Sequence, residues 1–203
     1  MFRISQAIVA AALAVALPAQ AESTSRTLMA EAKPMTSDGK LIGCSIEFMG
    51  TTEDHAYKDG GTVAYGGSVS MMITGQKDIR LGFKLSPGDL VTDVGGKMKV
   101  VPFLPASVFL ASRDGRSNSE DMVDTKESDT GGRLAVFEFG GNTANVYENI
   151  SYGDRFDFVF NRLSGGLDIR SWVDIAKEGD TSINETWRDC TIKVLEESVK
   201  AHE

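Results

Sequence analysis

Histidine and cysteine are scarce in this chain, with two of each among 203 residues. A catalytic zinc site normally takes two or three histidines, and a histidine base activates most serine and cysteine nucleophiles. His202 belongs to the C-terminal tail, so such a mechanism would depend on His55, which lies in a polar, charged segment. The H-E-x-x-H, G-x-S-x-G, Walker A and G-x-G-x-x-G patterns are also missing. The sequence therefore gives no support to the commonest hydrolase, metalloprotease and nucleotide-binding classes.

Long apolar runs and an excess of basic residues are missing too. The longest apolar run, residues 7–17, has eleven residues, fewer than the ~20 that cross a bilayer. Lys and Arg number 21 against 29 Asp and Glu, which gives a net charge of −8. Nucleic acids and anionic membrane surfaces both attract basic proteins. We therefore predict that this chain does not bind nucleic acid and is not an integral membrane protein.

The short apolar run fits a secretory signal peptide over residues 1–21, with an uncleaved anchor as the alternative. Arg3 precedes the run, Pro18 follows it, and residues 19–21 (AQA) form an A-x-A cleavage site. Cleavage there removes one arginine and no acid, so the net charge changes from −8 to −9. We predict a periplasmic or secreted protein with a flexible N-terminal arm over residues 22–40 and a single domain over residues 41–203.

The two cysteines, Cys44 and Cys190, stand near opposite ends of that domain. An even cysteine number in an exported protein indicates a disulfide. A redox or metal-binding thiol pair is the alternative, but the chain has no C-x-x-C and neither cysteine has a histidine nearby. We therefore predict a structural disulfide that joins the start of the domain to its end.

Apolar residues alternate with polar ones over most of the chain from Leu41 onward. This period of two is typical of antiparallel strands with one wet face. Six Gly-Gly pairs, most of them between apolar runs, suit tight hairpin turns. Within this pattern, Gly66-Gly67 suggests a bulge and Pro87-Gly88 a type II turn. The predicted strands cover residues 41–48, 62–74, 77–85, 89–94, 97–103, 107–112, 133–139, 155–163 and 167–175.

The last segment changes period. Its apolar residues recur at helical spacing around Cys190, and Ser182 followed by Glu185 resembles a capping box. These features favour a helix over residues 183–200, while a strand over residues 188–195 is the alternative. The sequence as a whole predicts a mainly β fold. We expect an antiparallel β-sandwich of about seven to nine strands, with a C-terminal α-helix tied to the first strand by the disulfide.

The longest stretch without a periodic pattern covers residues 113–132. Long irregular loops in compact domains are often functional, so we predict a partner-binding loop here. No cofactor is predicted, with Ca²⁺ as the alternative, because hard cations prefer oxygen ligands; the EF-hand spacing, however, is not met. The acidic residues proposed for this loop are Asp114, Glu120, Asp121 and Asp124.

We therefore predict an exported, non-enzymatic domain of unknown specific role. It would bind an unidentified protein or small molecule of the cell envelope through loops at one end of the sandwich. The alternative is a carboxylate-dependent hydrolase of cell-envelope polymers, since two suitably spaced acids suffice for glycoside hydrolysis. Candidate acids on strands are Asp157, Asp168 and Asp174, and Asp157 is expected on a wet face because it alternates with phenylalanines.

Overall fold

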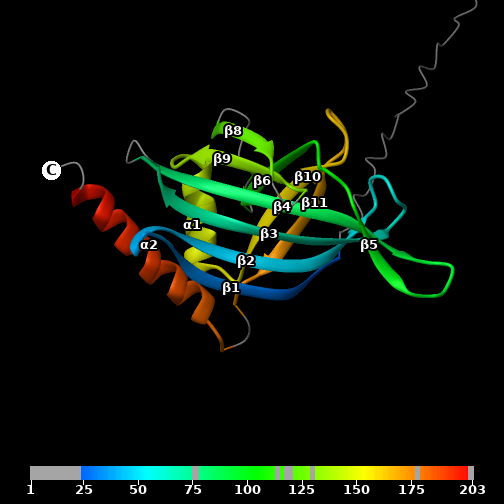
Figure 1. Ribbon diagram of the computed structural model, residues 1–203, viewed down its shortest axis with the longest axis horizontal. Helices are drawn as coiled ribbons and strands as arrows, with labels where there is room; N and C mark the ends of the chain where they lie inside the picture. The colour runs from blue at the N-terminus through cyan, green and yellow to red at the C-terminus, as the bar shows by residue number, and fades with distance from the viewer. Residues whose placement is uncertain are drawn as a thin grey trace, which may run out of the picture.

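The computed structural model describes residues 24–74, 78–112, 115–116, 121–128, 131–176 and 179–200 (Figure 1). Its elements are β1 (Ser25–Ser37), β2 (Lys40–Asp54), β3 (Gly61–Ile73), β4 (Ile79–Thr92), β5 (Met98–Pro102), β6 (Ser107–Ser112), β7 (Gly115–Arg116), β8 (Met122–Glu127), β9 (Arg133–Glu138), α1 (Asn142–Tyr152), β10 (Arg155–Asn161), β11 (Ile169–Asp174) and α2 (Ser182–Lys200). The predicted mainly β architecture with a C-terminal helix is confirmed. The described residues contain eleven strands, two of them in the segment predicted to be irregular.

All strand pairs are antiparallel, and they form two sheets. The large sheet has the order β1-β2-β3-β4-β9-β8, with β5 added to β4, and the small sheet has the order β11-β10-β6-β7. β9 pairs with the first half of β4, and β5 pairs with the second half of the same strand. Strands β1 to β4 are therefore a meander, and β4 extends beyond β9 to carry β5 (Figure 1).

The two sheets share one apolar core. Along β2, Cys44, Ile46 and Phe48 are at most 2% exposed, as their alternation predicts. The ring of Phe158 on β10 lies 5.9 Å from that of Phe48 and 5.1 Å from that of Tyr65 on β3, measured between centroids. Such aromatic pairs contribute beyond their buried area. The core is thus closed by aromatic side chains that meet between the sheets.

β10 is buried on both faces, so the expectation of a wet face for Asp157 is wrong. Asp157 is 7% exposed and Val159 is 4% exposed. β10 is an inner strand between β6 and β11, and Arg155 and Arg170 pair with the Asp157 carboxylate. A charged residue in a strand can thus be buried where arginines neutralise it, which alternation alone does not reveal.

β1 occupies most of the segment predicted as a flexible arm over residues 22–40. It pairs with β2 from Ser25 to Ser37. At its start it also contacts the small sheet, because Thr27 Oγ1 accepts a hydrogen bond from the backbone N–H of Asp174 (2.7 Å). Ser25 Oγ lies 2.9 Å from the carbonyl oxygen of Trp172. β1 therefore links the two sheets along one side of the molecule.

Two local predictions within the meander are wrong. Gly66-Gly67 forms no bulge, since the register of β3 is continuous with both β2 and β4. A Cβ on Gly67 would lie 2.2 Å from the carbonyl oxygen of Lys84 and 2.8 Å from the Phe48 ring, so glycine here permits close packing. Pro87 forms no turn, because β4 continues through it. Its carbonyl accepts from Phe103 N–H, which places its missing N–H in the gap between β9 and β5, where no partner is needed.

The C-terminal helix α2 is confirmed and the strand alternative is excluded. Its cap lies one residue earlier than predicted: Thr181 Oγ1 donates to Glu185 Oε1 (2.8 Å), and Asp180 Oδ1 accepts from Ser182 N–H. The short helix α1 was not predicted. It follows Gly140-Gly141, and Val146 and Ile150 are its buried apolar residues, too few to stand out from a β pattern. Within the described residues, no helix is both long and apolar enough to cross a membrane.

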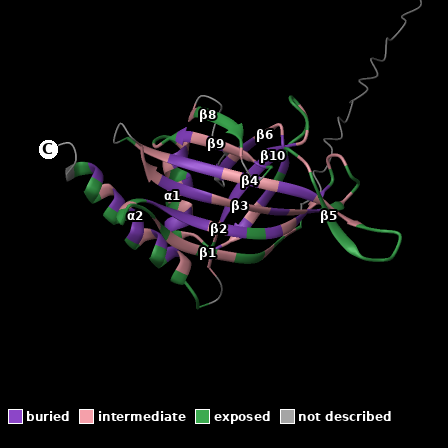
Figure 2. Cartoon of the chain, viewed as in Figure 1, coloured by how far each residue is buried: buried purple, intermediate pink, exposed green. Residues whose placement is uncertain are grey.

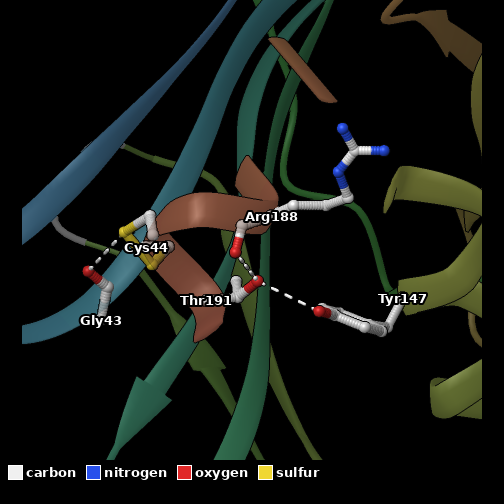
Figure 3. Close-up of a disulfide and its surroundings, with 6 residues drawn as sticks. Gly43, Cys44, Tyr147, Arg188 and Thr191 are labelled. Atoms are coloured by element: carbon white, nitrogen blue, oxygen red, sulfur yellow. Dashed lines mark hydrogen bonds between the residues drawn. A yellow bond between two sulfur atoms is a disulfide. The ribbon is translucent and has the colours of Figure 1, made fainter. Parts of the chain in front are cut away.

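The predicted disulfide is present and joins β2 to α2 through Cys44 and Cys190 (Figure 3). Cys44 is fully buried and Cys190 is 8% exposed, so the bond lies inside the fold. β2 is the second strand of the sheet, not the first as predicted. Beside the disulfide, Thr191 Oγ1 lies 3.1 Å from the hydroxyl of Tyr147 on α1. The bond therefore fixes α2 to the large sheet at the place where α1 also contacts α2.

Candidate functional site

Exposed apolar side chains gather at the end of the sandwich from which β5 projects. We define the β5 end as the β2–β3 turn (55–60), the β4–β5 turn (93–97), β5 with residues 103–106, and the β10–β11 loop (162–168). Fifteen large apolar residues of the described chain are exposed. Seven of them belong to the β5 end: Val94, Met98, Val100, Val101, Leu104, Leu163 and Leu167. Figure 2 shows β5 and its turn as a projecting, exposed hairpin. Exposed apolar clusters of this kind often mark interaction sites.

The β4–β5 hairpin is well ordered by its own sequence. Asp93 Oδ1 accepts hydrogen bonds from the N–H groups of Gly95 (2.8 Å) and Lys97 (2.9 Å). Gly96 has φ +76°, a conformation in which glycine is favoured. This is the turn that Gly95-Gly96 predicted. All five residues of β5 are exposed, so the hairpin presents Met98 and Val100 without a covering layer.

A partly buried arginine joins the strands beneath the β5 end. Arg162, just after β10, donates from Nε to Asp54 Oδ2 (2.6 Å) and from Nη2 to Asp89 Oδ1 (2.5 Å). Its guanidinium also lies 3.9 Å from the centroid of the Phe103 ring. Asp54 ends β2 and is 0% exposed, while Lys58 adds a second cation 3.6 Å from Asp89. One side chain of the small sheet thus binds two strands of the large sheet.

The same network holds the neighbouring turns. Asp54 Oδ1 accepts from the N–H of Tyr57 (2.9 Å), and the Tyr57 hydroxyl donates to the carbonyl of Leu167 (2.9 Å). Asn161 Nδ2 donates to Asp168 Oδ1 (2.6 Å) and to the same Leu167 carbonyl (3.0 Å). These contacts tie the β2–β3 turn to the β10–β11 loop. The β5 end is therefore a set of exposed loops held by a fixed polar network. This arrangement favours binding because the loops would lose little conformational entropy when a partner binds.

The charges of the network are matched. Burial raises the pKa of the Asp89 carboxyl, but hydrogen bonding and the charge of Arg162, aided by Lys58, outweigh burial and hold that pKa below its usual value of 3.8. Burial lowers the pKa of Arg162, but hydrogen bonds and charges from Asp89 and Asp54 raise it overall. At neutral pH Asp89 and Arg162 are therefore ionised and paired.

Low pH is expected to weaken the network of Arg162, Asp54 and Asp89 through protonation of Asp89. Because its pKa is lower in the folded state than in the unfolded one, its contribution to stability is complete above the unfolded-state pKa and declines as the pH falls below about 4. We expect Asp89→Asn to reduce stability at pH 6 and to lose less than the wild type between pH 6 and pH 3. Urea unfolding at both pH values measures this. Asp78→Asn, which alters an exposed partner of Arg80, is the control; equal acid losses in the wild type and Asp89→Asn would contradict the assignment.

The predicted acidic loop is partly described. Asp114 and Glu120 lie outside the described residues. Asp121 accepts a hydrogen bond from Asn142 Nδ2 (3.4 Å), and Asp124 pairs with Val136 in the β8–β9 ladder. Part of the segment is therefore strand rather than loop, because its polar residues pair with β9. The proposal that these four acids bind a partner remains a prediction.

Two of the three carboxylates considered for hydrolysis have separate partners. Asp157 accepts from Arg170 (3.0 Å), whereas Asp168 accepts from Asn161. Asp174 closes β11, where its backbone N–H donates to Thr27. His55 lies 2.9 Å from Glu53 Oε2, and hydrogen bonds from Thr24 and His55 lower the Glu53 pKa. In the described part of the chain, no group of three metal-binding side chains was found.

Sequence reasoning did not identify Arg162, Asp54, Asp89 or Phe103. Asp54 sits among acidic and polar residues at the end of a strand, and Arg162 follows the phenylalanine-rich β10. A charged residue directly after an apolar strand was the available signal, but its partners lie 108 and 73 residues away. Comparison with known proteins adds no further assignment: no protein-family model, curated protein or solved structure matches the chain.

Proposed function

We propose that this protein is an exported, non-enzymatic domain that binds a protein partner through the β5 end. The observation that carries the proposal is the projecting β4–β5 hairpin, where Met98 is 67% exposed and Val100 is 50% exposed. A soluble domain seldom leaves such residues together without a role. The sequence pattern of residues 1–21 and the Cys44–Cys190 disulfide support export, since disulfides persist mainly in oxidising compartments.

The network of Arg162 with Asp54 and Asp89 supports binding more than catalysis. Asp54 and Asp89 are both engaged by the same guanidinium. Arg162 holds the pKa of Asp89 below its usual value, so Asp89 is ionised at neutral pH and cannot act there as a general acid. This network fixes the loops around the hairpin. Rigid loops with apolar tips bind with a small entropy loss. The hydrolase alternative has no observation in its favour here.

Site-specific photo-cross-linking in the native host tests the proposal. A benzoylphenylalanine at Val94 or Met98 is expected to give a discrete cross-linked product, because both side chains are exposed on the hairpin. The matched controls are Tyr152 on α1 and Val199 on α2, which are 74% and 63% exposed. Both helices lie away from β5 (Figure 1). The same products from all four positions, or none from the hairpin, would count against a binding site at the β5 end.

A further inference from the structure

The outer edge of β5 is an open hydrogen-bonding edge. β5 pairs with β4 alone among the described strands. Asp93 N–H donates to Lys97 carbonyl, and Phe103 N–H donates to Pro87 carbonyl. The backbone N–H and C=O groups of successive residues along a strand point alternately to its two sides. The residues between Lys97 and Phe103 therefore point alternately toward β4 and away from it. Lys99 and Val101 therefore point their backbone groups at β4, and those of Met98 and Val100 point away from it.

The two faces of β5 differ in chemistry. Met98 and Val100 lie on one face, where Val100 is opposite Leu90 of β4. Lys97 and Lys99 lie on the other face, where Lys99 is opposite Val91. Val101 shares this second face, and Asp93 of the turn lies opposite Lys97. The outer strand itself, from Lys97 to Pro102, contains two lysines and no acidic residue, in a chain whose net charge is −8. One face of β5 is therefore apolar, and the other carries both lysines.

A second copy of this chain fits the edge poorly. If two β5 strands paired antiparallel with Met98 opposite Val100, Lys99 would lie directly opposite Lys99 of the other copy. If Met98 were opposite Met98, Lys97 would oppose Lys99, and like charges directly opposite are destabilising. If Val100 were opposite Val100, Met98 would face Pro102, which has no N–H to donate. Each symmetric register thus places either lysine against lysine or a backbone acceptor against proline.

We propose, on the basis of the function proposed above, that the partner adds an extended segment to the open edge of β5, with apolar and acidic residues in alternation. The backbone of that segment pairs with Met98 and Val100. Its apolar side chains cover the Met98 face, and its acidic side chains lie beside Lys97 and Lys99. Addition of a strand to a sheet edge is a recurrent mode of peptide recognition, in which alternate side chains give specificity.

The probe is a fluorescein-labelled, end-blocked heptapeptide, Val-Glu-Val-Glu-Val-Glu-Val, compared with the same peptide carrying lysine in place of glutamate. By fluorescence anisotropy with the intact protein, we expect the glutamate peptide to bind at least tenfold more tightly. The double variant Lys97→Glu/Lys99→Glu should reverse this preference. Lys126→Glu on β8 is the matched control, because Lys126 is an exposed lysine on another edge strand, and it should leave the preference unchanged. Equal binding of the two peptides would overturn the proposal.

Backbone pairing is tested by Val100→Pro, which removes an N–H that faces away from β4 and so preserves the β4–β5 ladder. We expect at least a tenfold loss of peptide binding with an unchanged circular dichroism spectrum. If this variant fails to fold, amide exchange of the wild type decides: bound peptide should slow exchange at Met98 and Val100, and unchanged exchange there refutes strand addition. Concentration-dependent elution in gel filtration, lost in Val100→Pro, would assign the edge to a second copy instead. A specific cross-link at Val94 without peptide binding would keep the proposed function and reject this partner chemistry.

Discussion

Loss of the Cys44–Cys190 disulfide is expected to lower the free energy of unfolding by about 2–5 kcal/mol. The bond joins residues 146 apart in sequence, so in its absence the unfolded chain gains much conformational freedom. Because Cys44 and Cys190 are buried between β2 and α2, the folded state also loses a fixed contact. Urea unfolding of the oxidised wild type, the reduced wild type and Cys44→Ala/Cys190→Ala measures the change.

Fluorescence emission from Trp187 reports which part of the fold separates first when the disulfide is reduced. Trp187 lies on α2 and is fully buried, so separation of α2 from the sheet should shift its fluorescence to longer wavelength. A Trp172→Phe background, used for all samples, restricts the signal to Trp187. We expect the shift to precede loss of the β circular dichroism signal in the reduced protein. Equal urea midpoints for oxidised and reduced protein would show that the bond contributes little to the fold.

Arg162→Met is expected to lower the free energy of unfolding by about 3–5 kcal/mol, because breaking a buried ion pair leaves an uncompensated charge. Asp54 is 0% exposed and would lose its arginine partner, and Asp89 would lose one as well. Methionine keeps much of the aliphatic volume, so the effect reports charge and hydrogen bonding rather than a cavity. Chemical denaturation at pH 7 provides the measurement.

Arg80→Met is the matched control for this substitution. Arg80 also pairs with two carboxylates, Asp78 and Glu138, but those are 47% and 64% exposed. Surface ion pairs contribute about 0–1 kcal/mol, so Arg80→Met should cost no more than that. If both substitutions cost the same, the Arg162 network would be an ordinary surface arrangement and not the base of the β5 end.

Much of the fold follows from sequence because the determining signals are local. The alternation around Ile46 and the stripe around Cys190 predict the meander strand and the terminal helix correctly. The cysteine pair, although distant in sequence, was predicted because a chain with two cysteines has one pairing available. Where a proline or a glycine pair has two structural uses, as at Pro87 and Gly67, tertiary contacts decide between a turn and a close approach.

The candidate site is much less predictable from the sequence than the fold is. Alternation cannot distinguish a strand that projects from the body, such as β5, from one that is half covered, since both contain Val and Lys. The pairing of Arg162 with Asp54 depends on how two sheets are stacked, which no local pattern records. The acidic segment after Arg113 attracted attention through composition alone, although part of it pairs with β9 through Asp124.

The position of the two cysteines has a consequence for the order in which this molecule can be completed. Strands β1 to β4 end at Thr92 and pair with neighbours in sequence, and such local contacts form early. Cys44 can therefore enter a sheet before α2 has joined the fold. Until α2 packs on the sheet, that thiol has no intramolecular partner, and the surface that will receive Trp187 is bare. A polypeptide interrupted before residue 190 would keep Cys44 as an unpaired thiol, because Cys190 is the one other cysteine of the chain.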